Sequence, residues 1–303
     1  MKNQLFFTLI SLILVTFTSC KKEAGNDPNG SWEIELMAQY NEVFSGDSYD
    51  LKNNIFSIEL AGTGTFSIDW GDGTVLADVT LKPSVCDEYG WYSGSEYTHT
   101  YDKVGTYQIK VSGTEGALLL FTCSNDRVEN FYSSLQLKNC SQLKWLACFG
   151  NNLTSLSLNN CAQLSVLYCE SNQLSTLDIS KNSQLQILDC SSNQLSALDV
   201  SKNLQLQELD CWGNQLSTLD VGKNLQLYVL NCGNNQLKVL DISKNMQLKK
   251  LGCADNYFSI SALNKIYTDL PTCSDNDPGY LDVDNKESAG DYYIAEEKGW
   301  IVL

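Results

Sequence analysis

A repeat of 21 residues runs through the second half of the chain and constrains its fold more than any other feature. Five complete units have this length, and each begins with a leucine: Leu143, Leu164, Leu185, Leu206 and Leu227. A sixth unit opens at Leu248, and a degenerate one opens at Leu118, 25 residues before Leu143. Self-similarity at a fixed period predicts a solenoid, in which each coil buries its apolar side chains against its neighbours.

Each unit has two halves with related spacing. The first half reads Leu-x-x-Leu-x-Cys-x-x-Asn, and the second reads Leu-x-x-Leu-x-(Ile/Val)-x-x-Asn. Residues two apart in an extended segment share a face, so Leu167 and Cys169 should point inward while Val166 and Tyr168 point outward. Because 21 residues leave too few for an outer helix, extended or 3₁₀ segments are expected on the outer side.

This pattern, over roughly residues 117–258, resembles the leucine-rich repeat, with cysteine in place of the third leucine. The resemblance implies a solenoid of stacked coils. The fold expected for the whole chain is mainly β, with an immunoglobulin-like β-sandwich at 31–113, leucine-rich repeats at 114–258 and a C-terminal cap at 259–303.

Seven cysteines share one place in successive coils: Cys123, Cys148, Cys169, Cys190, Cys211, Cys232 and Cys253. Parallel strands lie about 4.8 Å apart, whereas bridged cysteines need Cβ atoms about 3.8 Å apart. Free thiols packed as small apolar groups are therefore favoured over partial bridging or metal binding. Cys140 and Cys161 replace asparagine and could bridge each other, and the redox states of Cys86 and Cys273 stay open.

Two rows of asparagine and one of aspartate also repeat. The row after the inner strand is expected to bond backbone groups of adjacent coils: Asn151, Asn172, Asn193, Asn214, Asn235 and Asn256. A second row should act likewise at the opposite turn: Asn182, Asn203, Asn224 and Asn245. The outer aspartates are Asp178, Asp199, Asp220 and Asp241. A row of carboxylates suggests a calcium site, but a line of carboxylates facing solvent does not converge on one cation, so no metal is expected.

After residue 258 the repeat gives way to an amphipathic pattern. Apolar residues follow helical spacing from Ile260 to Leu270, and Pro271 ends the helix. A strand is expected at Tyr280, and a short helical turn should end at Gly299 before a last strand. The segment resembles the terminal cap of bacterial repeat proteins.

The amino-terminal region has short alternating β runs separated by Gly and Asp turns. Trp70-Gly-Asp-Gly-Thr74, Tyr97-Thr-His99-Thr-Tyr101 and the Gly105-x-Tyr107 strand resemble the polycystic-kidney-disease-type (PKD) immunoglobulin-like domain. The resemblance implies a structural role for these residues. The loop from Lys82 to Ser95 is rich in aromatic residues and either contacts a ligand or packs on the domain.

Residues 1–19 have the layout of a signal peptide, because their apolar run of about 13 residues is shorter than the roughly 20 that span a bilayer. The small residue before Cys20 resembles the lipobox of bacterial lipoproteins, which implies acylation of Cys20. Residues 20–30 read as a polar linker. An exported bacterial outer-membrane lipoprotein is expected, with surface or periplasmic orientation open and an ordinary secretory peptide as the alternative.

Charge and composition exclude several functions. The net charge is −16, with only one arginine, Arg127, and one histidine, His99. Phosphate recognition needs clustered cations, so nucleic acid is not a partner. No triad, HExxH or Walker-type spacing is present. A non-catalytic protein without cofactors, monomeric and held at the membrane through its lipid only, is expected.

The second, fourth and sixth places after each leading leucine do not repeat and are expected on an exposed strand face. They predict a binding surface for an extracellular protein or glycan, as in adhesion: Trp145, Phe149, Val166, Tyr168, Glu170, Ile187, Asp189, Glu208, Asp210 and Trp212. Large side chains on an exposed face are typical of recognition. Alternatively they shield the sheet or meet the neighbouring domain, and the protein is a structural spacer in the envelope.

Asp189 and Asp210 occupy the same place in adjacent coils, about 5 Å apart at the backbone. Retaining glycosidases hold two carboxyl groups about 5 to 5.5 Å apart. A glycan-acting enzyme is nevertheless only a remote alternative, because a flat ladder lacks the enclosing cleft that would separate two pKa values.

Overall fold

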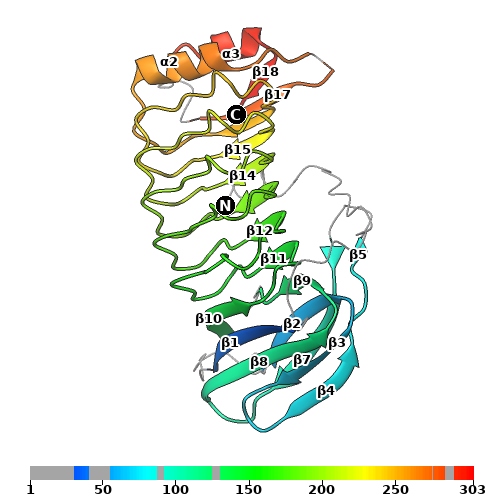
Figure 1. Ribbon diagram of the computed structural model, residues 1–303. Coiled ribbons are helices and arrows are strands. Elements are labelled where there is room, and N and C mark those ends of the chain that lie inside the picture. The colour runs from blue at the N-terminus through cyan, green and yellow to red at the C-terminus, as the bar shows by residue number, and fades with distance from the viewer. Residues whose placement is uncertain (1–30, 41–54, 87–91, 125–129, 275, 284–289) are drawn as a thin grey trace.

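The structure is a computed structural model of the chain and describes residues 31–40, 55–86, 92–124, 130–274, 276–283 and 290–303. Two parts are evident in Figure 1: strands of the amino-terminal region at one end, and stacked coils that lead away from them to two helices. The predicted signal peptide, Cys20 and the linker lie outside the described residues. Within the described residues, no helix has the length and apolarity needed to cross a membrane.

The coils form a β-solenoid with one short parallel strand per coil. These strands are β11 (Trp145–Ala147), β12 (Val166–Tyr168), β13 (Ile187–Asp189), β14 (Glu208–Asp210), β15 (Val229–Asn231) and β16 (Lys250–Gly252). Each pairs with its neighbour at a constant offset of one unit, as in Leu167 opposite Leu188. The predicted solenoid of leucine-rich coils in fixed register is therefore confirmed.

The two faces of the strands separate as the alternation predicts. Leu167 and Cys169 are fully buried in the main core, which runs through the solenoid. Val166 and Tyr168 belong to a second apolar cluster on the opposite face. On the outer side of the coils the described residues form turns and one isolated bridge, between Ser157 and Asp178. They form neither an α-helix nor a 3₁₀-helix there.

The amino-terminal strands divide between two sheets. One has the order β10-β1-β8-β3-β4. Its members are β1 (Trp32–Tyr40), β3 (Thr65–Asp69), β4 (Val75–Thr80), β8 (Gly105–Glu115) and β10 (Asn130–Lys138). The second sheet contains β2 (Ile55–Gly62), β7 (Ser95–Thr100) and β9 (Leu118–Thr122). A separate small hairpin is formed by β5 (Val85–Cys86) and β6 (Tyr92–Ser93). The immunoglobulin-like, PKD-type classification of this region stays a prediction.

The second sheet continues from the amino-terminal strands into the solenoid without interruption. Strand β9 pairs in parallel with β11 and antiparallel with β2, which in turn pairs with β7. One sheet of eleven strands thus begins with β7, β2 and β9 and continues through the solenoid strands to β18. Strand β10, which lies in the sequence range assigned to the repeats, pairs with β1. The two predicted domains thus share both sheets across the boundary expected near residue 113.

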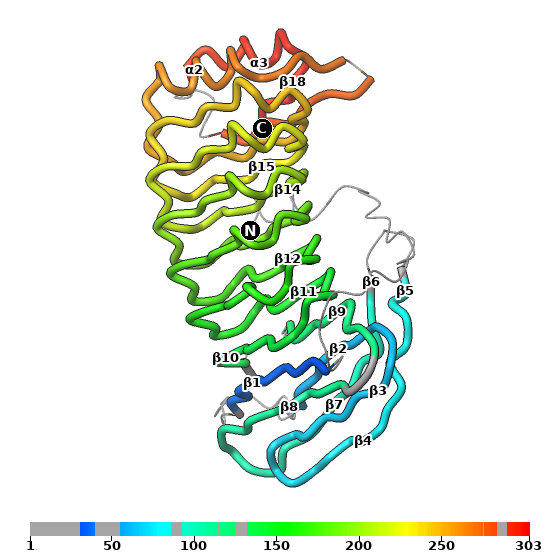
Figure 2. The backbone as a smooth tube through the Cα atoms, in the orientation of Figure 1, coloured from blue at the N-terminus to red at the C-terminus, as the bar shows by residue number. Residues whose placement is uncertain are grey.

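The carboxyl end adds two helices and two strands to the last coil. Figure 2 places α2 and α3 at the end of the solenoid away from the amino-terminal strands. Helix α2 (Ile260–Asp269) begins at Ser259, whose side chain accepts a hydrogen bond from the backbone N–H of Ala262. Strands β17 (Gly279–Asp282) and β18 (Trp300–Val302) extend the sheet, and α3 (Tyr293–Glu297) packs on β18. The helix, strand, helical turn and last strand occur where the sequence predicts them. The resemblance to a known type of cap stays a prediction.

Gly299 shows why the last turn needs glycine. Its φ is +80°, in the left-handed region, and a Cβ atom there would lie 2.7 Å from the carbonyl oxygen of Cys273. The next residue, Trp300, is buried and donates from Nε1 to the carbonyl oxygen of Pro271 at 2.7 Å.

Candidate functional site

The candidate site lies on the strand face opposite the leucine core. The register places Trp145, Val166, Ile187 and Glu208 in one line across β11 to β14. Tyr168, Asp189, Asp210 and Asn231 form a parallel line one pleat away. The structure therefore brings together the side chains that the sequence pattern grouped.

The prediction that this face is exposed throughout is wrong for half of the candidates. The buried ones retain 7 % or less of their accessible surface: Trp145, Val166, Tyr168, Ile187 and Glu208. The four apolar ones cluster with Ala147 and with Ala61 and Leu120, which come from the amino-terminal strands β2 and β9. The shared sheet thus gives one end of the face a small core of its own, in which the rings of Trp145 and Tyr168 lie 5.5 Å apart.

The other candidates keep part of their surface accessible. We call them the accessible strip: Phe149, Glu170, Asp189, Asp210 and Trp212. Phe149 packs at the border of the apolar cluster. The strip thus combines two aromatic rings with three carboxylates, supported by the buried cluster behind one end.

Asp189 and Asp210 lie in register on neighbouring strands. Burial raises the pKa of both carboxyl groups, and the nearby charge of Asp189 raises that of Asp210 further. Asp189 accepts a hydrogen bond from the backbone N–H of Ser191. Asp210 accepts one from the backbone N–H of Trp212 and one from Nδ2 of Asn231. Neither carboxylate forms an ion pair with a cation of the described residues. Both carboxyl groups therefore keep their protons to a higher pH than free aspartate does.

The indole of Trp212 lies across the next coil. A Cβ atom on Gly233 would lie 3.0 Å from Cδ1 of Trp212 and 3.1 Å from the carbonyl oxygen of Ala254. Glycine at position 233 therefore provides the space that the ring occupies. The backbone N–H of Trp212 donates a hydrogen bond to Oδ1 of Asp210, which holds residue 212 close to that carboxylate.

The asparagine row behind the inner strands fixes the coils that carry the strip. Asn193 donates from Nδ2 to the carbonyl oxygens of Cys169 and Cys190, and its Oδ1 accepts from the backbone N–H of Leu174 at 2.9 Å. The predicted bonding of adjacent coils is confirmed. At the opposite turn, Asn203 donates to the carbonyl oxygens of Ile179 and Asn182. The outer aspartates instead close their own turns, as Asp199 does for the N–H of Ser201.

The ten cysteines whose side chains the structure describes are all free thiols. The spacing favoured this state for the row of seven, and the bridge considered between Cys140 and Cys161 is not formed. Burial raises the pKa of the Cys190 thiol well above its usual value, so the row is chemically quiet. Cys273 is the one partly exposed thiol of the described set. Of the described His, Cys, Asp and Glu residues, no group has an arrangement that would hold a metal ion.

His99 has the structural environment expected of it. Its Nε2 lies 2.7 Å from Oδ2 of Asp72, and its ring stacks on Trp70 with centroids 5.1 Å apart. The turn from Trp70 to Thr74 is thereby joined to strand β7, which carries His99. In the loop from Lys82 to Ser95, β5 and β6 pair at the two ends, and the aromatic residues Tyr89 and Trp91 lie outside the described residues.

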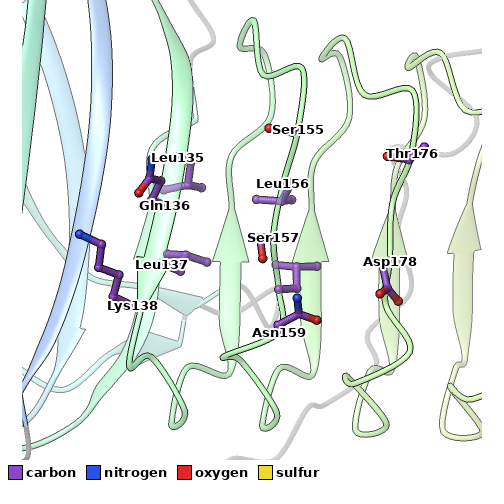
Figure 3. A pocket seen from close by; sticks show the side chains of 11 residues that line it. Leu135, Gln136, Leu137, Lys138, Ser155, Leu156, Ser157, Asn159, Thr176 and Asp178 are labelled. Atoms are coloured by element: carbon purple, nitrogen blue, oxygen red, sulfur yellow. The ribbon is translucent and has the colours of Figure 1, made fainter.

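One cavity was not anticipated from the sequence. It has a volume of about 430 Å³ and lies between β10 and the outer segments of the next two coils (Figure 3). Leu135, Leu137, Leu156 and Leu158 line its buried side, and polar groups such as Ser157 and Asp178 surround it. The only sequence signal was the irregular length of the first unit, which supplies β10.

No family model matches the chain, and no curated protein matches it either. Solved structures of bacterial leucine-rich-repeat proteins are similar to part of it. The functional domain of InlJ from Listeria monocytogenes, described as including a cysteine ladder, is 33 % identical with a TM-score of 0.43, covering 45 % of this chain and 30 % of that one. The internalin InlF from the same species is 26 % identical, with a TM-score of 0.38, covering 40 % and 37 %.

A leucine-rich-repeat protein of Leptospira interrogans is 23 % identical, with a TM-score of 0.37, covering 48 % of this chain and 44 % of that one. The chain thus spans less than half the length of each of these three relatives.

Proposed function

We propose that this protein is an exported, lipid-anchored binding protein without catalytic activity, which recognises an extracellular protein or glycan through the accessible strip. One observation carries the proposal. The framework residues of the coils repeat unit after unit, whereas the strip has Phe149, Glu170 and Trp212 at one and the same place of different coils. A pair of aspartates, Asp189 and Asp210, lies beside them on the same face. A position that serves only to stack coils has no reason to differ in this way.

The chemistry of the strip suits recognition. Phe149 and Trp212 offer flat apolar surface, and Asp189 and Asp210 offer acceptors for the hydroxyl groups of a sugar or for a basic side chain. The buried cluster beneath one end makes the support rigid, which reduces the entropy lost on binding. The asparagine bonds between coils add to this rigidity.

The binding proposal is tested on the mature chain carrying Cys20→Ser, probed against arrays of glycans and extracellular proteins. The affinity for any ligand that the arrays identify reproducibly should fall at least tenfold in the double variant Phe149→Ala and Trp212→Ala. The matched control is Tyr257→Ala, which removes an exposed ring elsewhere on the solenoid. Unchanged binding in the strip variant, or equal loss in the control, would refute the assignment of the strip.

The rival proposal is a spacer that holds an envelope neighbour in place without a specific ligand. A complete absence of hits for the wild type, with correct folding shown by circular dichroism, would favour the spacer.

The lipid anchor is a separate part of the proposal and has its own test. Wild-type protein expressed in a bacterial host should partition with membranes, and Cys20→Ser should release it to the soluble fraction. External protease added to intact cells then reports orientation. If Cys20→Ser partitions like the wild type, acylation of Cys20 is wrong.

A further inference from the structure

Three exposed apolar side chains form a line along one corner of the solenoid, away from the accessible strip. Leu204, Leu225 and Met246 retain 52 %, 54 % and 64 % of their accessible surface. They occupy the same place in successive units, directly after the asparagines of the second row. We call this line the apolar ridge. In the three preceding units the place holds Ser141, Ala162 and Ser183.

The ridge is held by the turns beneath it. Leu204 is the second residue of a turn closed by the hydrogen bond from the backbone N–H of Leu206 to the carbonyl oxygen of Asn203, and the other two turns are closed in the same way. Adjacent turns are joined, since Asn224 donates from Nδ2 to the carbonyl oxygen of Asn203 at 2.9 Å. The ridge residues therefore repeat at one-coil spacing, about 4.8 Å.

Polar rows lie on both sides of the ridge. Lys202, Lys223 and Lys244 precede the ridge residues by two positions and are exposed. On the other side a glutamine row follows directly, and within it Gln226 donates from Nε2 to Oε1 of Gln205 at 3.4 Å. The corner thus presents cations, apolar groups and amides in parallel lines.

We propose that the apolar ridge is a self-association surface, which pairs with the ridge of a second copy whose solenoid runs in the same direction. A rigid line of side chains at one-coil spacing is matched in period by another such line, and a second copy supplies one. A two-fold axis parallel to the solenoid sets the lysine row of each copy against the glutamine row of its partner. The antiparallel arrangement sets lysine against lysine, which repels.

The contact is small. Three half-exposed side chains cover much less than the roughly 800 Å² per partner of a stable complex, so the copies separate in dilute solution, where the sequence predicts a monomer. Copies anchored to one membrane, as the proposed lipid would arrange, point the same way at high effective concentration. Only this last step depends on the lipid proposal, and the ridge does not depend on the accessible strip.

The first experiment is sedimentation equilibrium of the mature chain carrying Cys20→Ser, at concentrations up to about 1 mM. A concentration-dependent dimer is expected, and Leu225→Ser with Met246→Ser should weaken its dissociation constant at least tenfold. The control Val239→Ser removes another exposed apolar side chain, 68 % accessible but off the ridge. A wild type that stays monomeric, or a control that weakens the dimer equally, overturns the proposal.

The second experiment tests direction, with Cys86→Ser and Cys273→Ser added to lower the background. A short bis-maleimide should crosslink Leu204→Cys to itself, because a parallel pair apposes equivalent residues. Crosslinking seen only in a mixture of Leu204→Cys with Met246→Cys would show the antiparallel arrangement and refute the parallel one. Circular dichroism establishes that each variant is folded.

Discussion

Asn231 donates a hydrogen bond of 2.9 Å from Nδ2 to Oδ2 of Asp210, its in-register neighbour on the adjacent coil. On the other side of Asp210 the corresponding neighbour is Asp189, a second carboxylate. One aspartate thus has a neutral donor on one flank and a negative charge on the other.

Replacing Asp189 by asparagine should stabilise the protein at neutral pH. The folded-state pKa values of Asp189 and Asp210 lie above the unfolded value of about 3.9, so the native state binds more protons and loses stability as pH rises from about 4 through the folded pKa values. Asp189→Asn removes this loss and keeps the acceptor for Ser191. A gain on the order of 1 to 2 kcal/mol at pH 8, falling towards zero near pH 4, is expected in thermal melts.

Asp199→Asn is the matched control, because Asp199 lies in the outer row of the same coil pair. Hydrogen bonds from Ser201 lower the pKa of this carboxyl group. Its contribution to stability is therefore present at neutral pH and lost on acidification, so the substitution should slightly destabilise the neutral protein. If both variants shift the melting temperature in the same direction at pH 8, the electrostatic account of the strip is wrong.

Asn193→Ala should destabilise the solenoid by about 2 kcal/mol. The substitution leaves the backbone N–H of Leu174 without its partner inside the protein, and a buried unpaired donor is costly. The carbonyl of Cys169 loses one of its two amide donors and keeps the other, from Asn172. Gln194→Ala, at the exposed next position, is the control and should have little effect. Urea unfolding monitored by circular dichroism measures both, and comparable losses would contradict the role of the asparagine row.

Gly233→Ala should displace the indole of Trp212. The new methyl group meets both the ring and the carbonyl of Ala254, and the carbonyl yields less readily than a side chain. A loss of about 1 to 2 kcal/mol is expected, with a shift of the Trp212 signal in ¹⁹F spectra of fluorotryptophan-labelled protein. At Gly105 an added Cβ atom makes only ordinary contacts, 3.5 Å from the Tyr107 ring, so Gly105→Ala should leave that signal in place.

Thiol reactivity should distinguish Cys273 from the cysteines of the core. In mature protein carrying Cys20→Ser and Cys86→Ser, one thiol should react rapidly with a chromogenic disulfide reagent, because nine of the ten described cysteines are buried. All ten should react after unfolding in denaturant without reductant. Fewer than ten would reveal a disulfide, and several fast thiols in the native protein would contradict the packing of the row.

Much of the solenoid followed from residue spacing. The inward direction of Leu167 and Cys169, the bonding by the asparagine rows and the helix after Ser259 depend on contacts within a coil or with the next copy of the same coil. A repeat contains that information, because each unit is its neighbour's environment. The composition of the strand face was predictable for the same reason.

The repeat left open whether that face is exposed or meets the neighbouring domain, because the answer depends on residues far away in the sequence. Ala61 and Leu120 reach the face only because β9 pairs with both β2 and β11. The repeat pattern does not predict the pairing of β2 with β9, because these strands lie some sixty residues apart in the sequence. The cavity beside β10 likewise arises where an irregular strand leaves the repeat to pair with β1. The sequence by itself determined the coil, its core and its bonded rows, since these are local and repeated. Only the tertiary structure decided which side chains of the face remain accessible, since burial depends on what packs above a surface as well as on the strand that forms it.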